Sequence, residues 1–72
     1  MEIKQLSEKY IKDVAAIEKA CFSKPWNEIS IAAELKNEFS RFYVAVEGGK
    51  AVGFVGLYAL TGEADIVRVG VL

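Results

Sequence analysis

Residues 63–72, EADIVRVGVL, carry the strongest β-strand signal of this 72-residue chain. Val and Ile are β-branched and favour extended backbone, so the stretch 63–71 is predicted to form a strand. Apolar side chains fall on both faces of that strand, which is typical of a strand with a neighbour on each side. They are Ile66, Val67, Val69 and Val71. The segment therefore predicts a strand that needs a further partner along its open edge.

Two more strands are predicted immediately before it. Residues 41–46, RFYVAV, alternate Phe42, Val44 and Val46 with other side chains, which indicates a strand with one buried face. Gly48-Gly49 follows, and two glycines in a row favour a tight hairpin because they accept positive φ. Residues 51–60, AVGFVGLYAL, then form the returning strand. Thr61-Gly62 is predicted to make a second turn, so the three strands form an antiparallel meander.

The first 40 residues have a different pattern. EIKQL, residues 2–6, predicts a short strand, and a helical period begins near Ser7. The apolar face of this helix is predicted to hold Ile11, Val14, Ile17 and Cys21, with Lys12, Glu18 and Lys19 elsewhere on the helix. Ser7 or Asp13 is the expected cap, and Cys21 is expected to be a small core residue.

Pro25 ends the first helix, because a proline clashes with a helical residue before it. CFSKPW, residues 21–26, is therefore a linker, and Asn27 is the predicted N-cap of a second helix that contains Ile31 and Leu35. The predicted order is strand-helix-helix-strand-strand-strand, an α+β fold, in one domain spanning residues 1–72.

Composition excludes several function classes. Nine basic and ten acidic residues give a net charge of −1, without the basic excess that nucleic-acid binding favours. No apolar run approaches the roughly 20 residues that span a bilayer, and the first residues lack a signal-peptide core. The absence of His excludes His-based triads and His-ligated metal sites from this chain, and no metal site is expected. With one cysteine and no export signal, a cytoplasmic location is expected.

The chain is apolar for its size. Hydrophobic residues make up 53% of it, yet a domain of this length has little core to offset its chain entropy without a disulfide or a metal. Either the chain associates with a partner, or it is part of a larger domain.

Three segments together resemble the first half of the GNAT acetyltransferases, in particular the bacterial enzymes that acetylate the N-terminal alanine of a ribosomal protein. They are IEKACFSKPWNEISIAAEL, FYVAVEGGKAVGFVGLY and GEADIVRVGVL, residues 17–35, 42–58 and 62–72. The resemblance implies acetyl-CoA as the cofactor and an amine as the acceptor, such as a protein N-terminus.

The resemblance also implies what lies outside these 72 residues. In the family, a Gly-rich loop that cradles the pyrophosphate of CoA follows the fourth strand directly, because backbone N–H groups and a helix dipole attract phosphate. In the alanine-acetylating members, the residues that act as base and acid also lie further on, in the fifth strand and a later helix. The chain is therefore expected to be a truncated GNAT domain that is inactive alone.

Site residues follow from the same resemblance. The backbone of Val69, Gly70 and Val71 matches the strand segment that binds the pantetheine arm, whereas their side chains are expected to be ordinary strand residues. Asp65 lies near the position where related histone acetyltransferases carry a glutamate as general base; the alternative is a solvated strand residue. The resemblance implies that Phe22, Pro25 and Trp26 line the acceptor side; the alternative is that Phe22 and Trp26 fill the core between the helices.

Two function classes remain open at this point. The first is a fragment of an acetyl-CoA-dependent N-acetyltransferase that acts on an amine, such as a protein α-amino group. The second is an interaction module without catalysis, whose last strand pairs with a second copy or with another partner. Association with the missing half through the last strand is a further possibility.

Overall fold

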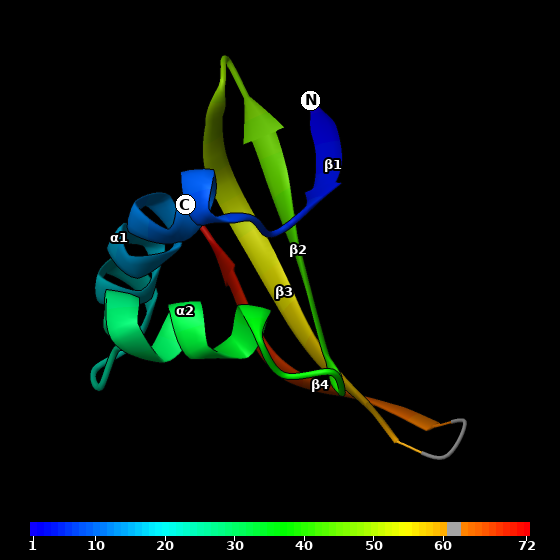
Figure 1. The fold of residues 1–72 in the computed structure, drawn as a ribbon. Helices are drawn as coiled ribbons and strands as arrows, with labels where there is room; N and C mark the ends of the chain where they lie inside the picture. The colour runs from blue at the N-terminus through cyan, green and yellow to red at the C-terminus, as the bar shows by residue number, and fades with distance from the viewer. Residues whose placement is uncertain (61–62) are drawn as a thin grey trace.

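The computed structural model describes residues 1–60 and 63–72 of the chain, without the side chains of Leu60 and Ala64. Within these residues, two α-helices lie on one face of a four-stranded antiparallel sheet (Figure 1). In chain order the elements are β1 (Glu2–Gln5), the 3₁₀ helix η1 (Glu8–Tyr10), α1 (Ile11–Cys21), α2 (Glu28–Leu35), β2 (Ser40–Glu47), β3 (Lys50–Leu60) and β4 (Glu63–Val71). The predicted α+β order is confirmed.

The sheet has the order β1-β2-β3-β4, so each strand pairs with the strand that precedes or follows it in the chain. Gly48 and Gly49 join β2 to β3 with φ of 61° and 80°, both positive as a type I′ hairpin turn requires. The turn predicted at Thr61-Gly62 lies outside the described residues. Among the described strands β4 has β3 as its only neighbour, although its apolar pattern is typical of a strand with two.

The core lies between the helices and the sheet. Phe42, Val44 and Val46 alternate into it from β2, as predicted, and Val14 and Ile17 of α1 have no exposed surface. Phe22 and Trp26, which follow α1, pack against this core while staying partly exposed. The helices cover one face of the sheet and leave the opposite face open (Figure 1).

Helix starts differ in how well the sequence predicts them. Asn27 caps α2, since its Oδ1 accepts the Ser30 N–H at 2.9 Å. Neither predicted cap serves α1, which begins at Ile11 after η1, and the side chain of Ser7 makes no capping bond. Asp13 instead reaches across to the sheet, where its Oδ2 accepts the Ala51 N–H at 3.0 Å. This bond fixes α1 to the start of β3.

Two predictions about which residues of α1 face the core are wrong. Cys21 is exposed, because the last turn of α1 reaches the rim of the sheet; the Cys21 thiol donates to the Val71 carbonyl oxygen at 3.4 Å. Glu18 is buried, with no exposed surface. It follows Ile11 by seven residues, which is two helical turns, so it shares the core-facing side of the helix.

Candidate functional site

The outer edge of β4 presents main-chain groups at two of the three residues predicted to bind the pantetheine arm. The Leu72 N–H donates to the Val52 carbonyl oxygen at 3.0 Å, so Leu72 faces β3. Main-chain direction alternates along an antiparallel strand. The N–H and C=O of Val69 and Val71 therefore point away from β3, whereas those of Gly70 point toward it.

Gly70 has a packing role on the helix side of the sheet. A Cβ placed on it would lie 2.7 Å from Cε1 of Phe54 and 3.0 Å from Cγ2 of Ile17. The strand therefore approaches α1 closely here, while the side chains of Val69 and Val71 stay 50% and 68% exposed.

A β-bulge interrupts β4 just before this edge. Gly56 of β3 faces Arg68, and Leu57 faces Ile66, so Val67 is the additional residue on β4. A bulge adds local twist and shifts the alternation of side chains by one position. It places Arg68 on the helix side of the sheet, where its guanidinium meets Glu18.

Arg68 and Glu18 form a bidentate ion pair. Arg68 Nε donates to Glu18 Oε2 at 2.6 Å, and Nη2 donates to Oε1 at 2.5 Å. The Glu18 side chain is 0% exposed and that of Arg68 18%. Glu18 Oε1 also accepts the backbone N–H of Trp26 at 2.9 Å. The buried carboxylate is thus hydrogen-bonded at both oxygens, which a buried charge requires.

Two aromatic rings flank the guanidinium. The Cζ of Arg68 lies 4.1 Å from the centroid of the Phe22 ring and 4.6 Å from that of Trp26. Both distances are within the range of cation–π attraction. The planar guanidinium binds the carboxylate with two N–H groups and lies over both aromatic rings, which a lysine cannot reproduce.

The ion pair changes the titration of both partners. Burial would raise the pKa of Glu18, but the hydrogen bonds from Arg68 and from the Trp26 N–H, with the positive charge of Arg68, outweigh burial and hold this pKa below its usual 4.5. The hydrogen bond to Glu18 raises the pKa of Arg68 above its usual value. Both groups therefore stay charged at neutral pH.

The structure brings two of the three predicted acceptor-side residues together beside β4. Phe22 and Trp26 are half-buried and contact Arg68, and the Trp26 ring also packs on Phe42 with centroids 6.2 Å apart. Pro25 is exposed. Phe22 and Trp26 thus fill space against the core and also form a partly exposed aromatic wall next to the bulged strand.

Asp65 lies at the other end of β4, exposed and opposite Tyr58 of β3. Directly opposed residues share one face of a sheet. Tyr58 donates its hydroxyl to Glu34 Oε1 of α2 at 3.1 Å, so this face is the one that carries the helices. The bond to the Glu34 carboxylate, with burial, raises the pKa of Tyr58 above 10.0. Asp65 and Arg68 therefore lie on the same face of β4.

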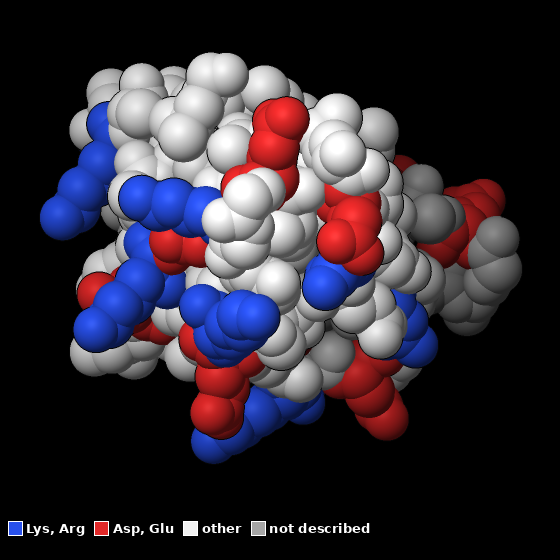
Figure 2. All heavy atoms as spheres, turned by 90° about the horizontal axis from the view of Figure 1, so that it is seen from above, with Lys and Arg blue, Asp and Glu red and all other residues white. Residues whose placement is uncertain are grey.

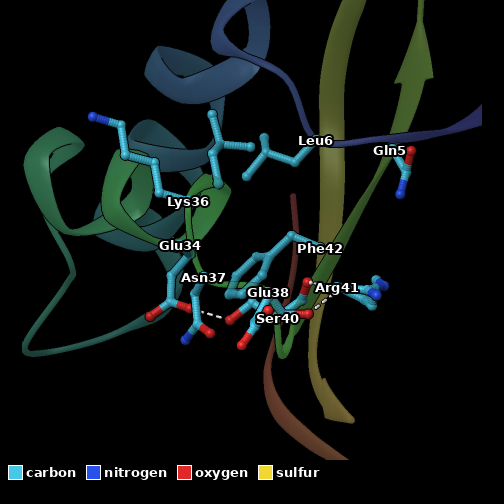
Figure 3. Close-up of a pocket in the computed structure, with 10 residues that line it drawn as sticks. Gln5, Leu6, Glu34, Lys36, Asn37, Glu38, Ser40, Arg41 and Phe42 are labelled. Carbon is cyan, nitrogen blue, oxygen red and sulfur yellow. Dashed lines mark hydrogen bonds between the residues drawn. The ribbon is translucent and has the colours of Figure 1, made fainter.

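A cavity of about 320 Å³ lies at the end of α2 (Figure 3). Glu34 accepts the hydroxyl of Ser40 there, and Arg41 donates to the carbonyl oxygens of Glu38 and Ser40 at 2.7 and 2.8 Å. These bonds close the connection between α2 and β2. The side chains of Glu34, Ser40 and Arg41 are therefore engaged in holding the fold.

Glu18 and Arg68 are the site residues that the sequence analysis missed. The sequence contains a signal for them, since each is a charged residue at a position where the pattern of its helix or strand predicts an apolar one. Glu18 lies on the core side of α1, and Arg68 interrupts the run IVRVGV. Opposite charges at two such positions indicate a buried pair, because an isolated buried charge is too costly.

Other kinds of site find no support in the described part of the chain. On the face shown in Figure 2, basic and acidic side chains lie beside one another rather than in separate areas. Among residues 1–60 and 63–72, no three or more His, Cys, Asp or Glu residues gather as metal ligands. None of the described helices is long and apolar enough to cross a membrane.

Two helices on one face of an antiparallel meander, with a bulged last strand, form the first part of an acetyltransferase fold. The family comparison matches residues 11–72 to the acetyltransferase (GNAT) family, so the chain belongs to the GNAT family. This confirms the resemblance seen in the sequence. A comparison with curated proteins gives no significant match.

Two solved structures share the fold. One is the ribosomal-protein-S18-alanine N-acetyltransferase from Escherichia coli, with a TM-score of 0.82 and 21% identity over 97% of this chain. The other is an aminoglycoside antibiotic 6′-N-acetyltransferase from Acinetobacter haemolyticus, with a TM-score of 0.77 and 19% identity over 100% of this chain. The present chain spans 44% and 57% of those two proteins, respectively.

Proposed function

We propose that this chain is the N-terminal part of an acetyl-CoA-dependent N-acetyltransferase whose acceptor is a protein α-amino group, and that it has no transfer activity alone. The single observation that carries the proposal is the outer edge of β4. Val69 and Val71 turn main-chain groups to that edge, and Phe22 and Trp26 contact Arg68, the residue directly before Val69. The family membership and the E. coli structure support the choice of reaction and acceptor.

The cofactor fits this edge. The pantetheine arm of acetyl-CoA carries amide groups, and an extended arm with amides pairs with an open strand edge as another strand does. Val69 offers its N–H and C=O and Val71 its N–H at the spacing of a strand, while the Val71 carbonyl oxygen accepts the Cys21 thiol. When bound, acetyl-CoA supplies the activated acetyl group as a thioester.

The residues of this chain act mainly by positioning. Val69 and Val71 orient the arm, and the aromatic wall holds the acceptor at the strand, so that attack occurs within one complex. The exposed carboxylate of Asp65 is the candidate acceptor for the amine proton, on the helix side of β4. The chain spans 44% and 57% of the two acetyltransferases that share its fold, which is the reason to expect no turnover. A reducing cytoplasm is the proposed setting.

Titration of the ¹⁵N-labelled chain with acetyl-CoA and with S-acetylpantetheine, which lacks the pyrophosphate, tests the proposal by NMR. We expect equal shifts at the Val69 and Val71 amides with both ligands, and no acetylation of a peptide N-terminus. Val71→Pro removes an outward N–H without removing a bond to β3, so it should abolish the shift at the remaining Val69 amide. Val71→Thr keeps the main-chain groups and should retain the shifts.

Two results would contradict the proposal. If neither ligand causes shifts in the wild type, the outer edge of β4 does not bind the pantetheine arm. Tight, saturable binding that strongly favours acetyl-CoA over S-acetylpantetheine would show that the chain already holds the pyrophosphate.

A second candidate function is favoured by the exposed apolar side chains of β4. Val69 and Val71 lie on an edge that has no further strand beside it among the described residues, the combination by which edge strands pair with one another. In this alternative the chain is an interaction module that dimerises through β4. Sedimentation would then give twice the 7.9 kDa of one chain, Val71→Pro would give a monomer, and neither ligand would cause shifts.

A further inference from the structure

We infer that Arg68 is a positioning residue for the acceptor site: with Glu18 it clamps the loop of residues 22–26 onto β4, so that the aromatic wall stands beside Val69 and Val71. The inference rests on the proposed function, because it assigns the wall to the acceptor. Arg68 does not itself touch the reacting atoms in this role; it acts through Phe22 and Trp26.

Glu18 holds both ends of this loop. Its main-chain oxygen accepts the Phe22 N–H at 2.9 Å, and its side-chain Oε1 accepts the Trp26 N–H at 2.9 Å. In the described part of the chain, these are the hydrogen bonds formed by the backbone of residues 22–26. The position of the loop therefore depends on where the Glu18 carboxylate is held.

Arg68 fixes that carboxylate to the strand. Its two hydrogen bonds join residues 50 positions apart in the chain, and its guanidinium contacts the rings at the two ends of the loop. Arg68 is also next to Val69, whose main chain faces the open edge. One side chain thus fixes the position of the aromatic wall relative to the edge of β4. A displacement of about 1 Å between two such elements is enough to impair a transfer reaction.

A purely structural role would be served better by apolar residues. Replacement of a buried ion pair by apolar residues of similar volume is often neutral or stabilising, so retention of charge points to specificity of geometry. A bidentate pair restricts direction as well as distance, which an apolar contact does not. This is the property that a positioning residue needs.

The chain contains a single tryptophan, so its fluorescence reports on the loop directly. In the double variant Glu18→Gln/Arg68→Met, which leaves no unpaired charge, we expect acrylamide quenching of Trp26 to increase at least about twofold, because the guanidinium no longer covers the ring. Arg41→Met is the matched control. Arg41 is the other arginine of the chain, and its hydrogen bonds go to the carbonyl oxygens of Glu38 and Ser40 rather than to the loop that carries Trp26. This control should leave quenching unchanged.

A second readout concerns the acceptor. A short peptide with an N-terminal alanine should shift the Trp26 indole N–H signal in the wild type and in Arg41→Met, and should fail to do so in the folded double variant. Arg68→Lys keeps the charge without the planar fork and should recover only part of the response. Circular dichroism identifies the folded variants.

One measurement needs no variant. The Arg68 Nε–H should exchange with water much more slowly than that of Arg41, because it is bonded to a buried carboxylate. Equal exchange rates at the two arginines, or unchanged Trp26 quenching in the folded double variant, would overturn the clamp. A different pair of results would overturn the proposed function and leave the clamp standing. In that case S-acetylpantetheine causes no shifts in the wild type, while Trp26 quenching still increases in the double variant.

Discussion

At the scale of single residues, the Glu18 carboxylate is held by several hydrogen bonds at once. It has no exposed surface, and Arg68 and the Trp26 N–H supply its hydrogen bonds. Removal of one partner of a buried ion pair typically costs about 3–5 kcal/mol, because the other charge is left buried and unpaired. Replacement of both partners together is far less costly, which makes the double variant the informative one.

The same pair predicts how stability depends on pH. The pKa of Glu18 is lower in the folded chain than its usual 4.5, so the folded state binds this proton less readily than the unfolded state. The stabilisation is fully present above pH 4.5 and is lost as the pH falls through the folded-state pKa. Urea unfolding from about pH 6 to about pH 3 should show a smaller loss of stability for Glu18→Gln/Arg68→Met than for the wild type. Parallel curves would contradict this assignment.

At the scale of secondary structure, α2 depends on one capping side chain. Asn27 Oδ1 satisfies the Ser30 N–H, which has no partner within the helix. Asn27→Ala should lower the free energy of unfolding by about 1 kcal/mol. Ser30→Ala is the matched control, because Ser30 contributes only its main-chain N–H and the variant keeps it. A change within about 0.5 kcal/mol is expected there, and an equal loss in both variants would contradict the capping role.

Features set by neighbouring residues were predictable from the sequence. The Asn27 cap, the Gly48-Gly49 turn and the alternation of Phe42, Val44 and Val46 each depend on contacts within a few positions of the chain. The side of α1 on which Glu18 lies was not predictable in this way, because burial of its charge depends on Arg68 in another element. Cys21 follows the apolar spacing of α1, but the helix reaches the rim of the sheet before that residue is covered.

The bulge explains why the candidate site was only partly predicted. In a regular strand, residues 65 and 68 would lie on opposite faces, since side chains alternate. Val67 adds one residue to β4, so Asp65 and Arg68 share the face that carries the helices. The family resemblance identified the strand segment and the aromatic wall. It did not identify the ion pair that relates them.

At the scale of the whole molecule, the sheet is covered on one side only. The helices bury the inner face, while Ile3, Val69 and Val71 remain exposed. The sequence predicts a partner for such surface, since an apolar chain of this length has more hydrophobic surface than one small core can bury. The GNAT structures that share the fold are about twice as long.

The order of strands in the sheet also has a consequence for the speed of folding. Each strand of the β2-β3-β4 meander pairs with its neighbour in sequence, so little loop-closure entropy opposes these pairings. The ion pair between Glu18 and Arg68, in contrast, closes a span of 50 residues. The hairpin at Gly48-Gly49 should form early and the ion pair late. In stopped-flow experiments, Gly49→Ala should therefore mainly slow folding, because the φ of 80° is strained for alanine, and Glu18→Gln/Arg68→Met should change mainly the unfolding rate. The meander would then exist before the clamp closes, and the geometry proposed for the acceptor would form after the strand edge beside it.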